Sequence, residues 1–223
     1  MDGVKWRRWA NASRFVAVIQ TGIGLTKAQD ACETVLDKRP WTVFIASGFA
    51  GALVPSQIGD LVIPEQVSCQ DPRLTGSSIT IACSASYRQQ AWNTARLLEN
   101  TVLSGRLVTV ENIVWLARDK QAIGRAFEAS SLDMESAAIG TMAARRDIPF
   151  FVVRSVSDRA EEDLPLDLNP FCRADTFLKG AWTVAATPGL WPRINRLRRQ
   201  KNVASASLTQ FFETFLSRAQ NSA

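Results

Sequence analysis

Short apolar runs alternate along this chain with segments whose apolar residues recur every three or four positions. The runs predict strands at 14–21, 41–47, 61–67, 78–83, 106–110, 131–134 and 149–156. The periodic segments predict helices at 25–38, 87–100, 115–127 and 135–146, with more helical segments beyond a polar loop after Asp158. Strands that alternate with helices predict an α/β fold, a single domain with a mixed, twisted sheet flanked by helices on both faces.

Two of these strands have distinctive compositions. Residues 149–156 (PFFVVRSV) form the most hydrophobic run, which is typical of a strand at the centre of a sheet that helices cover on both faces. Residues 14–21 (RFVAVIQT) predict a second buried strand, and glycines turn it into the first helix. No repeat or linker interrupts the pattern, so we expect one domain over residues 1–223, with a basic helical C-terminal extension at 188–223.

Composition narrows the chemistry. The chain has 223 residues, of which 46% are hydrophobic and 21% charged, so it is long enough to bury a core without disulfide or metal staples. It contains no histidine, which excludes histidine bases and triads and nearly every catalytic zinc site. Acid–base chemistry therefore falls to Asp, Glu, Lys, Tyr87 or water, and we expect no metal. The four cysteines are scattered and predict buried thiols in a reducing, cytoplasmic compartment.

Polar or glycine-containing turns follow several predicted strands. They comprise Gly22 and Gly24 in TGIG, Gly48 to Gly51 in SGFAG, the acidic run Asp133-Met134-Glu135, and the pair Ser157-Asp158. In an open α/β sheet, ligands bind beyond strand ends, where glycines let backbone N–H groups approach closely. No turn completes a dinucleotide-binding or nucleoside-triphosphate-binding glycine motif, so we expect no such cofactor.

The order of these turns resembles the nucleoside phosphorylase and nucleosidase superfamily, which includes methylthioadenosine/S-adenosylhomocysteine nucleosidase. The resemblance rests on TGIG, SGFAGAL, GDLVIPE, LDMESAAI and FFVVRSVSD, in that order between residues 14 and 158. SLDMESAA, the SDRAEEDLP loop and a basic tail are most similar to the hopanoid-biosynthesis-associated branch, which removes adenine from adenosylhopane. The resemblance implies a phosphorylase-like three-layer sandwich and a homo-oligomer, such as a dimer.

The resemblance also implies roles for particular residues. Asp158, with Ser157 beside it, matches the acid that protonates the purine at N7 as the glycosidic bond breaks. Glu135 matches the glutamate that accepts hydrogen bonds from the ribose hydroxyls, and Met134 matches the methionine beneath the sugar. The family usually has glutamate where this chain has Asp133, whose shorter side chain puts direct ligand contact in doubt.

Other matched positions shape the predicted pocket. The Gly22 and Gly48 turns line it, and Ile113 matches an apolar wall of the base site. Phe49 stands where many relatives carry a serine or threonine that contacts phosphate or sugar. A phenyl ring offers that anion no hydrogen bond, so this departure favours hydrolysis, or a bulky apolar substrate, over phosphorolysis.

The resemblance begins late in the family's fold. Members of the family start with a further strand and turn, which in the hydrolases supplies the glutamate thought to activate water. Residues 1–13 contain no glutamate, and the family's N-terminal strand is expected to be missing from this sequence. The start could lie further upstream, another residue such as Glu65 or Glu111 could activate water, or the protein could be catalytically impaired.

The C-terminal tail carries the excess charge. Residues 191–201, from Trp191 to Lys201, contain five basic residues and no acidic one, which equals the whole net charge of +5. As a helix, this segment is either an ordinary solvated surface or a peripheral contact with anionic lipid headgroups. No aromatic and basic module predicts nucleic-acid binding.

The resemblance thus implies a purine nucleosidase that cleaves the N-glycosidic bond of a small or lipid-linked adenosyl compound, most specifically adenosylhopane, and releases adenine. The alternatives are a phosphate-dependent purine nucleoside phosphorylase and a catalytically impaired protein that binds a nucleoside or lipid.

Overall fold

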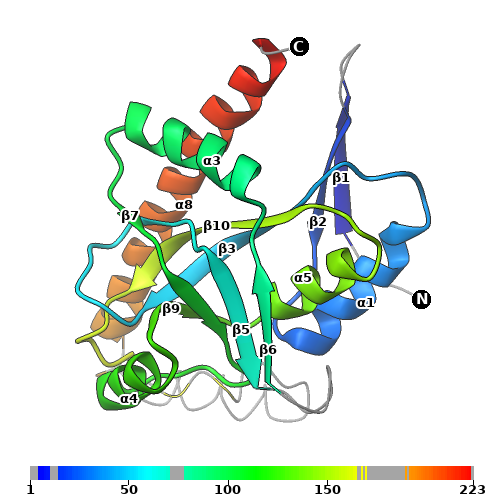
Figure 1. Cartoon of the computed structure of the whole chain (residues 1–223). Coiled ribbons are helices and arrows are strands. Elements are labelled where there is room, and N and C mark those ends of the chain that lie inside the picture. The colour runs from blue at the N-terminus through cyan, green and yellow to red at the C-terminus, as the bar shows by residue number, and fades with distance from the viewer. Residues whose placement is uncertain are drawn as a thin grey trace.

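The structure is a computed structural model that describes residues 5–10, 15–70, 78–164, 167, 169, 189 and 191–221. Its main feature is an eight-stranded mixed sheet in the order β6-β5-β8-β9-β3-β10-β4-β7 (Figure 1). A separate two-stranded sheet pairs β1 with β2. The predicted α/β fold with a mixed sheet is confirmed.

The elements of the described part follow one another in sequence. The strands are β1 Lys5–Ala10, β2 Phe15–Gln20, β3 Phe44–Ala52, β4 Leu61–Val62, β5 Gln66–Gln70, β6 Ser78–Ala82, β7 Val102–Leu103, β8 Arg106–Thr109, β9 Ala129–Asp133 and β10 Phe150–Asp158. The helices are α1 Leu25–Leu36, α3 Ala85–Leu97, α4 Ala117–Phe127, α5 Ser136–Ala144 and α8 Trp191–Asn221.

Strands β3 and β10 form the centre of the molecule. They run parallel, with Phe150 opposite Phe44 and Arg154 opposite Gly48, and the register shifts between Val156 and Asp158. Every residue of β10 is buried, as its apolar sequence predicts. The two strands therefore provide a rigid base for any polar side chain that they carry.

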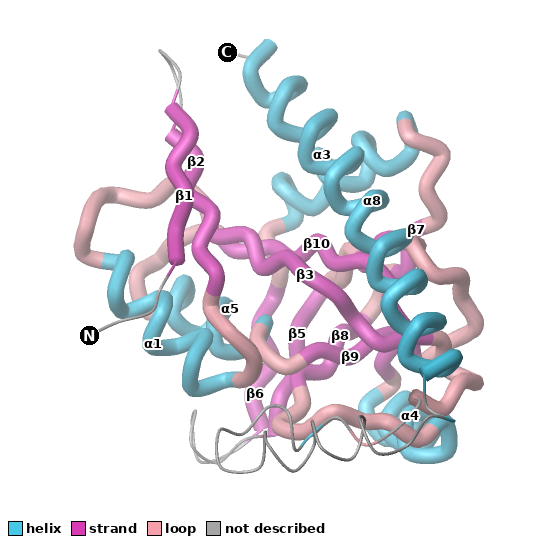
Figure 2. Tube along the Cα trace, turned by 180° about the vertical axis from the view of Figure 1, so that it is seen from behind, coloured by secondary structure: helices cyan, strands magenta, loops and turns pink. Residues whose placement is uncertain are grey.

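Helices cover this central pair on both sides. In Figures 1 and 2, α3 and α8 lie on one side of β3 and β10, and α1 and α5 lie on the other. Phe211 and Phe215 of α8 are buried in the same hydrophobic core as Phe151 of β10. None of the described helices combines the length and apolar composition that a membrane span needs.

Three sequence predictions need correction. Residues 15–20 form a strand, but this strand is only partly buried and pairs with β1 outside the main sheet. Residues 48–51 continue β3 rather than turning away from it. The strand expected at 61–67 is divided into β4 and β5 around Pro64, which has no N–H to donate to a ladder.

The prediction of buried thiols is confirmed at the three described cysteines. Cys32, Cys69 and Cys83 are buried and form no disulfide with one another, and burial raises the pKa of Cys32 to about 11 and that of Cys83 to about 12. Cys172 lies outside the described residues.

Candidate functional site

A buried arginine organises the first part of the site. Arg154 lies in the middle of β10, and its guanidinium contacts two carboxylates, Asp133 at 2.5 Å and Glu135 at 3.3 Å. Its Nη1 donates to the Phe49 carbonyl at 2.9 Å, and its Nε donates to the Ser136 hydroxyl at 3.2 Å. These partners come from β3, β9 and the start of α5, so Arg154 joins three elements. We call these five residues the Arg154 cluster.

Asp133 is the fully buried carboxylate of this cluster. Its Oδ1 accepts a hydrogen bond from the Thr109 hydroxyl at 2.7 Å, and Oδ2 accepts one from the Ser136 backbone N–H at 3.0 Å. With both oxygens bound by the protein, Asp133 is placed to orient Arg154 rather than to touch a ligand. Its short side chain suits this position at the end of β9.

Glu135 is the more accessible carboxylate. Its Oε1 accepts a hydrogen bond from the backbone N–H of Gly24 at 3.0 Å, which brings the TGIG turn containing Gly22 against the site. Burial raises the pKa of Glu135 above its ordinary value, and the Arg154 guanidinium partly offsets that rise. Glu135 contacts Arg154 through Oε2, and the Glu135 side chain is 14% exposed. Glu135 therefore lies at the surface of the cluster, and the half-buried Met134 precedes it in the chain.

Gly48 allows the close approach of β3 and β10. Its φ is +147°, and a Cβ atom there would lie 3.1 Å from Arg154 Nη1. A side chain at this position would push the guanidinium from its partners. The next residue, Phe49, is 37% exposed while its carbonyl holds Arg154.

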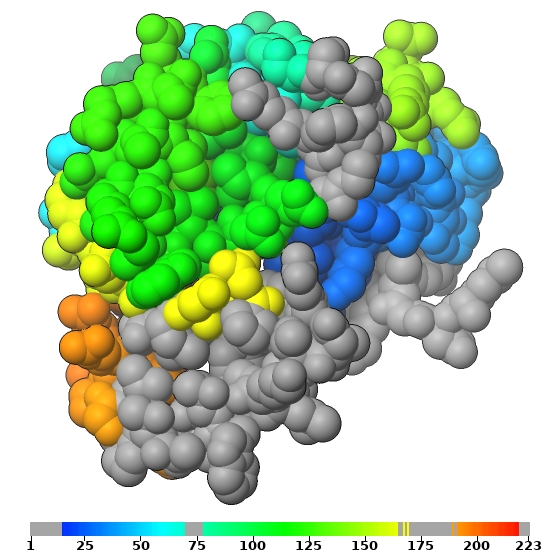
Figure 3. Space-filling model, turned by 90° about the horizontal axis from the view of Figure 1, so that it is seen from below, coloured from blue at the N-terminus to red at the C-terminus, as the bar shows by residue number. Residues whose placement is uncertain are grey.

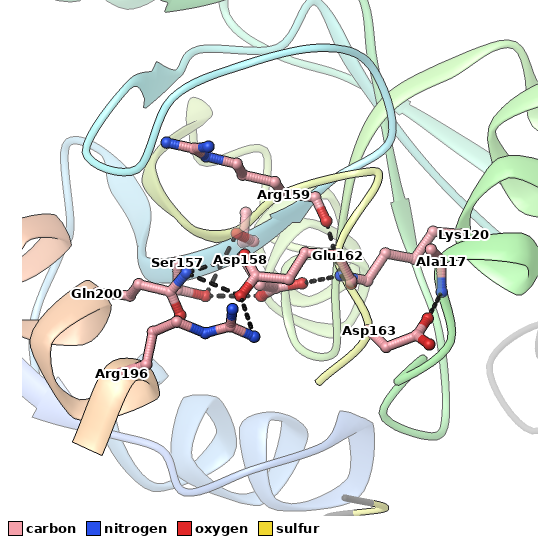
Figure 4. A network of polar contacts seen from close by, with 10 residues as sticks. Ala117, Lys120, Ser157, Asp158, Arg159, Glu162, Asp163, Arg196 and Gln200 are labelled. Carbon is pink, nitrogen blue, oxygen red and sulfur yellow. Dashed lines mark hydrogen bonds and ion pairs between the residues drawn. The ribbon is translucent and has the colours of Figure 1, made fainter. Parts of the chain in front are cut away.

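The second part of the site is Asp158 at the end of β10. Oδ1 accepts a hydrogen bond from the Ser157 hydroxyl at 2.9 Å, and Oδ2 contacts Lys120 Nζ at 2.5 Å (Figure 4). The Asp158 side chain is 12% exposed. A Cβ at Gly51 would lie 3.0 Å from Oδ2, so glycine in β3 makes room for this carboxyl group. We call Asp158, Ser157 and Lys120 the Asp158 cluster.

The two clusters lie on the same pair of strands. Arg154 is opposite Gly48 and Asp158 is opposite Gly51 in the β3–β10 ladder. The four-residue separation along β10 corresponds to about 13 Å of strand, and the side chains of both clusters extend from it. This arrangement places a carboxylate paired with arginine and a carboxyl group paired with lysine along the same stretch of the β3–β10 ladder.

Three other residues singled out in the sequence, Ile113, Glu65 and Glu111, belong to neither cluster. Ile113 is half-buried, and its backbone N–H and carbonyl both bond the side-chain amide of Asn169. Thr109, which bonds Asp133, lies opposite Cys69 near the last residue of β5. Glu65 precedes the first residue of β5, at the other end of the strand, so Glu65 lies away from the Arg154 cluster. Glu111 is exposed just beyond β8, at the same end of that strand as Thr109.

A charged hollow adjoins the Asp158 cluster. It has a volume of about 600 Å³ and is lined by residues that follow β10, including Arg159 and Glu162, and by Arg193 and Arg196 of α8. Neither Glu135 nor Asp158 is among its lining residues. The hollow is therefore a neighbour of the two clusters rather than their enclosure.

Sequence reasoning missed Arg154 and Lys120. Arg154 was visible as the one charge inside the most hydrophobic strand, where an unpaired cation would be costly. Lys120 shares its helical face with Ile123 and Phe127, three and seven positions later, which are packed hydrophobic residues of a second core cluster. A charge on an apolar stripe was the available signal in both cases.

Together, these features define a class of protein: an α/β protein in which two clusters of buried, ion-paired carboxyl groups gather around a central pair of parallel strands. A family model described as the phosphorylase superfamily matches residues 11–174. The chain belongs to this superfamily, and the predicted membership is confirmed.

Curated relatives in this superfamily cover most of the chain. A 5'-methylthioadenosine/S-adenosylhomocysteine nucleosidase of Shewanella oneidensis is 30% identical over 173 residues, which are 72% of this chain and 73% of the relative. A protein of the same name from Listeria monocytogenes is 25% identical over 191 residues, 77% of this chain and 80% of the relative.

Solved structures share the fold. A mutant of the Helicobacter pylori nucleosidase, solved with 5'-methylthioadenosine in its active site, has a TM-score of 0.71 at 18% identity and covers 96% of this chain and 86% of its own. The futalosine hydrolase of Helicobacter pylori strain 26695 has a TM-score of 0.69 at 18% identity, with 96% and 85% covered. At these identities, the likeness establishes the fold.

Proposed function

We propose that this protein is a purine nucleosidase that cleaves the N-glycosidic bond of an adenosyl compound and releases adenine. The observation that carries the proposal is the pair of clusters on β3 and β10, with Asp158 at one end and Glu135 with Arg154 at the other. The names of the curated relatives agree with this activity.

Asp158 serves as the general acid in this proposal. As the C1'–N9 bond breaks, its electron pair moves to the purine, and N7 takes a proton from the Asp158 carboxyl group. Adenine then leaves as a neutral base rather than a poor anionic leaving group. A water oxygen bonds to C1' and releases one proton to the solvent, and Asp158 takes one proton back from the solvent before the next turnover. The Ser157 hydroxyl, 2.9 Å from Oδ1, holds the carboxyl group in the plane it needs.

Glu135 serves as the ribose ligand. Its carboxylate accepts hydrogen bonds from the sugar hydroxyls while Arg154 and Gly24 fix its position. Negative charge beside the sugar also stabilises the oxocarbenium-like transition state. Met134 packs beneath the sugar, Gly22 and Gly48 shape the walls, and Ile113 borders the base. Asp133 acts through Arg154 and is a positioning residue.

The identity of residue 49 favours water over phosphate as the second reactant. Phe49 presents a phenyl ring where a phosphate ligand would need a hydroxyl, and its carbonyl is already occupied by Arg154. Phosphorolysis remains the second candidate, because Arg154 is a cation near the sugar site and phosphate binds arginine well.

The 5'-substituent is proposed to be apolar, most specifically the hopane skeleton of adenosylhopane. Ile23 in the TGIG turn is 50% exposed and precedes Gly24, which contacts Glu135; Phe49 is 37% exposed, and its own carbonyl contacts Arg154. Exposed apolar side chains beside a sugar site favour a substrate with a large apolar group.

Two further proposals concern partners. Residues 191–201 begin α8 with Trp191 and five exposed basic side chains, which suits peripheral contact with anionic lipid headgroups where a lipid-linked substrate resides. Flotation with anionic liposomes should fall when the five basic residues are replaced by glutamine. A homo-oligomer, such as a dimer, is proposed from the family resemblance, and sedimentation equilibrium tests it.

Product analysis tests the activity itself. The protein is incubated with adenosine, 5'-methylthioadenosine or adenosylhopane, with and without phosphate, and free adenine and the sugar product are measured. We expect adenine without added phosphate and a free reducing sugar. Ribose 1-phosphate formed only with phosphate would establish the phosphorylase alternative. Purine binding without adenine release under any condition would overturn the enzymatic proposal.

A further inference from the structure

The most deeply buried charge in the described part of the chain lies beside the proposed acid. Lys120 is the one residue of α4 that is buried, and its side chain is 0% exposed. Nζ contacts Asp158 Oδ2 at 2.5 Å and donates to the backbone carbonyls of Arg159 at 2.9 Å and Glu162 at 3.1 Å (Figure 4). Three acceptors match the three N–H donors of an ammonium group. The three contacts therefore use every N–H group that a lysine ammonium can offer.

These contacts place Lys120 between the acid and the segment that follows it. The segment after β10 is fastened to α4 at more than one point, because Asp163 accepts a hydrogen bond from the Ala117 N–H at 2.7 Å. In Figure 3, the yellow segment after β10 lies between the green surface that includes α4 and the orange beginning of α8. Lys120 thus fixes both the carboxyl group and the backbone that leads away from it.

We propose that Lys120 is the positioning residue of Asp158, holding Oδ2 so that Oδ1 faces the purine and stabilising the carboxylate that remains once the proton has left. This inference rests on the proposed function and adds a residue that sequence reasoning did not assign. Lys120 does not touch the substrate and keeps its own three protons. The proton leaves Oδ1 for purine N7, and the ammonium favours the transfer because it contacts the resulting anion.

The other charged side chains near Asp158 pair with residues other than Asp158. Glu162, from the segment after β10, pairs its carboxylate with Arg196 of α8 at 2.9 Å and accepts hydrogen bonds from Gln200. Arg159 points its guanidinium to Gln57 at 2.7 Å, and Arg154 belongs to the other cluster. Strand β3 contributes Gly51 at this point. Within the part of the chain that the structure describes, Lys120 is therefore the cation in direct contact with Asp158.

The test compares Lys120→Met, which removes the charge but keeps the length of the side chain, with Lys120→Arg, which keeps the charge. Lys38→Met, at an exposed position just after α1, is the matched control. Adenine release is measured across pH. Without the ammonium, the protonated carboxyl is favoured, so the high-pH limb of the Lys120→Met profile should move up by about one to three pH units. Its kcat should fall about 10- to 100-fold, with KM changed less than about threefold.

Lys120→Arg should restore the position of the high-pH limb, and Lys38→Met should match the wild type. A Lys120→Met protein that loses activity without any movement of the limb would show a merely structural role and overturn the proposal. If Lys120→Met does not fold, Lys120→Gln takes its place, since its amide can still donate to the two carbonyls while carrying no charge.

A second measurement separates this inference from the proposed activity. With aspartate labelled by carbon-13 at the carboxyl carbon, the Asp158 signal is the one absent from the Asp158→Asn spectrum. Its titration midpoint should lie about one to three pH units higher in the neutral variant than in the wild type. This shift is expected even if the wild type releases no adenine, which would overturn the nucleosidase proposal alone. An unmoved midpoint would overturn the role of Lys120 whatever the activity.

Discussion

Replacing Asp133 by asparagine tests how the Arg154 cluster is held together. The substitution keeps the size of the side chain but removes the charge that contacts Arg154 at 2.5 Å, where both side chains are almost completely buried. Removing one partner of a buried ion pair costs about 3–5 kcal/mol, because the other charge is left without compensation. Glu135 still contacts Arg154 at 3.3 Å, so we expect a loss at the lower end, about 3 kcal/mol. For a chain of this length, that loss lowers the Tm by about 6–12 °C.

The matched control is Asp37→Asn, which removes the same group from an exposed pair. Asp37 contacts Arg146 at 2.7 Å, with side chains 75% and 50% exposed. Surface pairs contribute less than about 1 kcal/mol, so the Tm should change by less than about 4 °C. Thermal unfolding followed by circular dichroism measures both variants. Equal Tm losses for Asp133→Asn and Asp37→Asn would refute the view that Asp133 is a buried support of the site.

Three further predictions concern protonation, thiol reactivity and the C-terminal helix. Burial raises the pKa of Glu135 above its ordinary value of 4.5. The folded state therefore binds the carboxyl proton of Glu135 more tightly than the unfolded state does, and the stability that this proton contributes is lost as the pH rises from 4.5 through the raised pKa. In urea melts, the free energy of unfolding of Glu135→Gln minus that of the wild type should therefore increase from pH 4 to pH 7, and a decrease would contradict the argument. Since the pKa of Cys32 is about 11 rather than 9.0, alkylation of the native thiol at pH 8 should be about 100-fold slower than in urea; equal rates would contradict its burial. Phe211→Ala should cost about 3–5 kcal/mol and the exposed Val203→Ala less than about 0.5 kcal/mol in the same melts, and similar losses would show that α8 does not complete the core.

The periodic and strongly apolar parts of the fold could be predicted from the sequence. The run around β10 identified the central strand because a strand buried on both faces needs apolar residues at successive positions. The helix after Glu135 was recognised from its small apolar residues. The order of the glycine-containing and acidic motifs also identified the superfamily, which the family model matches over residues 11–174.

Other features depended on tertiary contacts that no local pattern records. Gly48 and Gly51 suggested a turn, but Gly48 is required by the close approach of Arg154 and Gly51 by that of Asp158 within a continuous strand. The detached pairing of β2 with β1 could not be read from apolar composition, which fits a central strand equally well. Lys120 is placed beside Asp158 through α4, 38 residues earlier in the chain.

The most direct test of the central claim is the rate of adenine release by Asp158→Asn. Asparagine keeps the shape of the side chain and cannot protonate N7, so kcat with the best substrate of the panel should fall about 10²- to 10⁴-fold. Circular dichroism and the Tm confirm that the variant is folded. A folded Asp158→Asn protein that releases adenine at the wild-type rate would contradict the assignment of Asp158 as the acid.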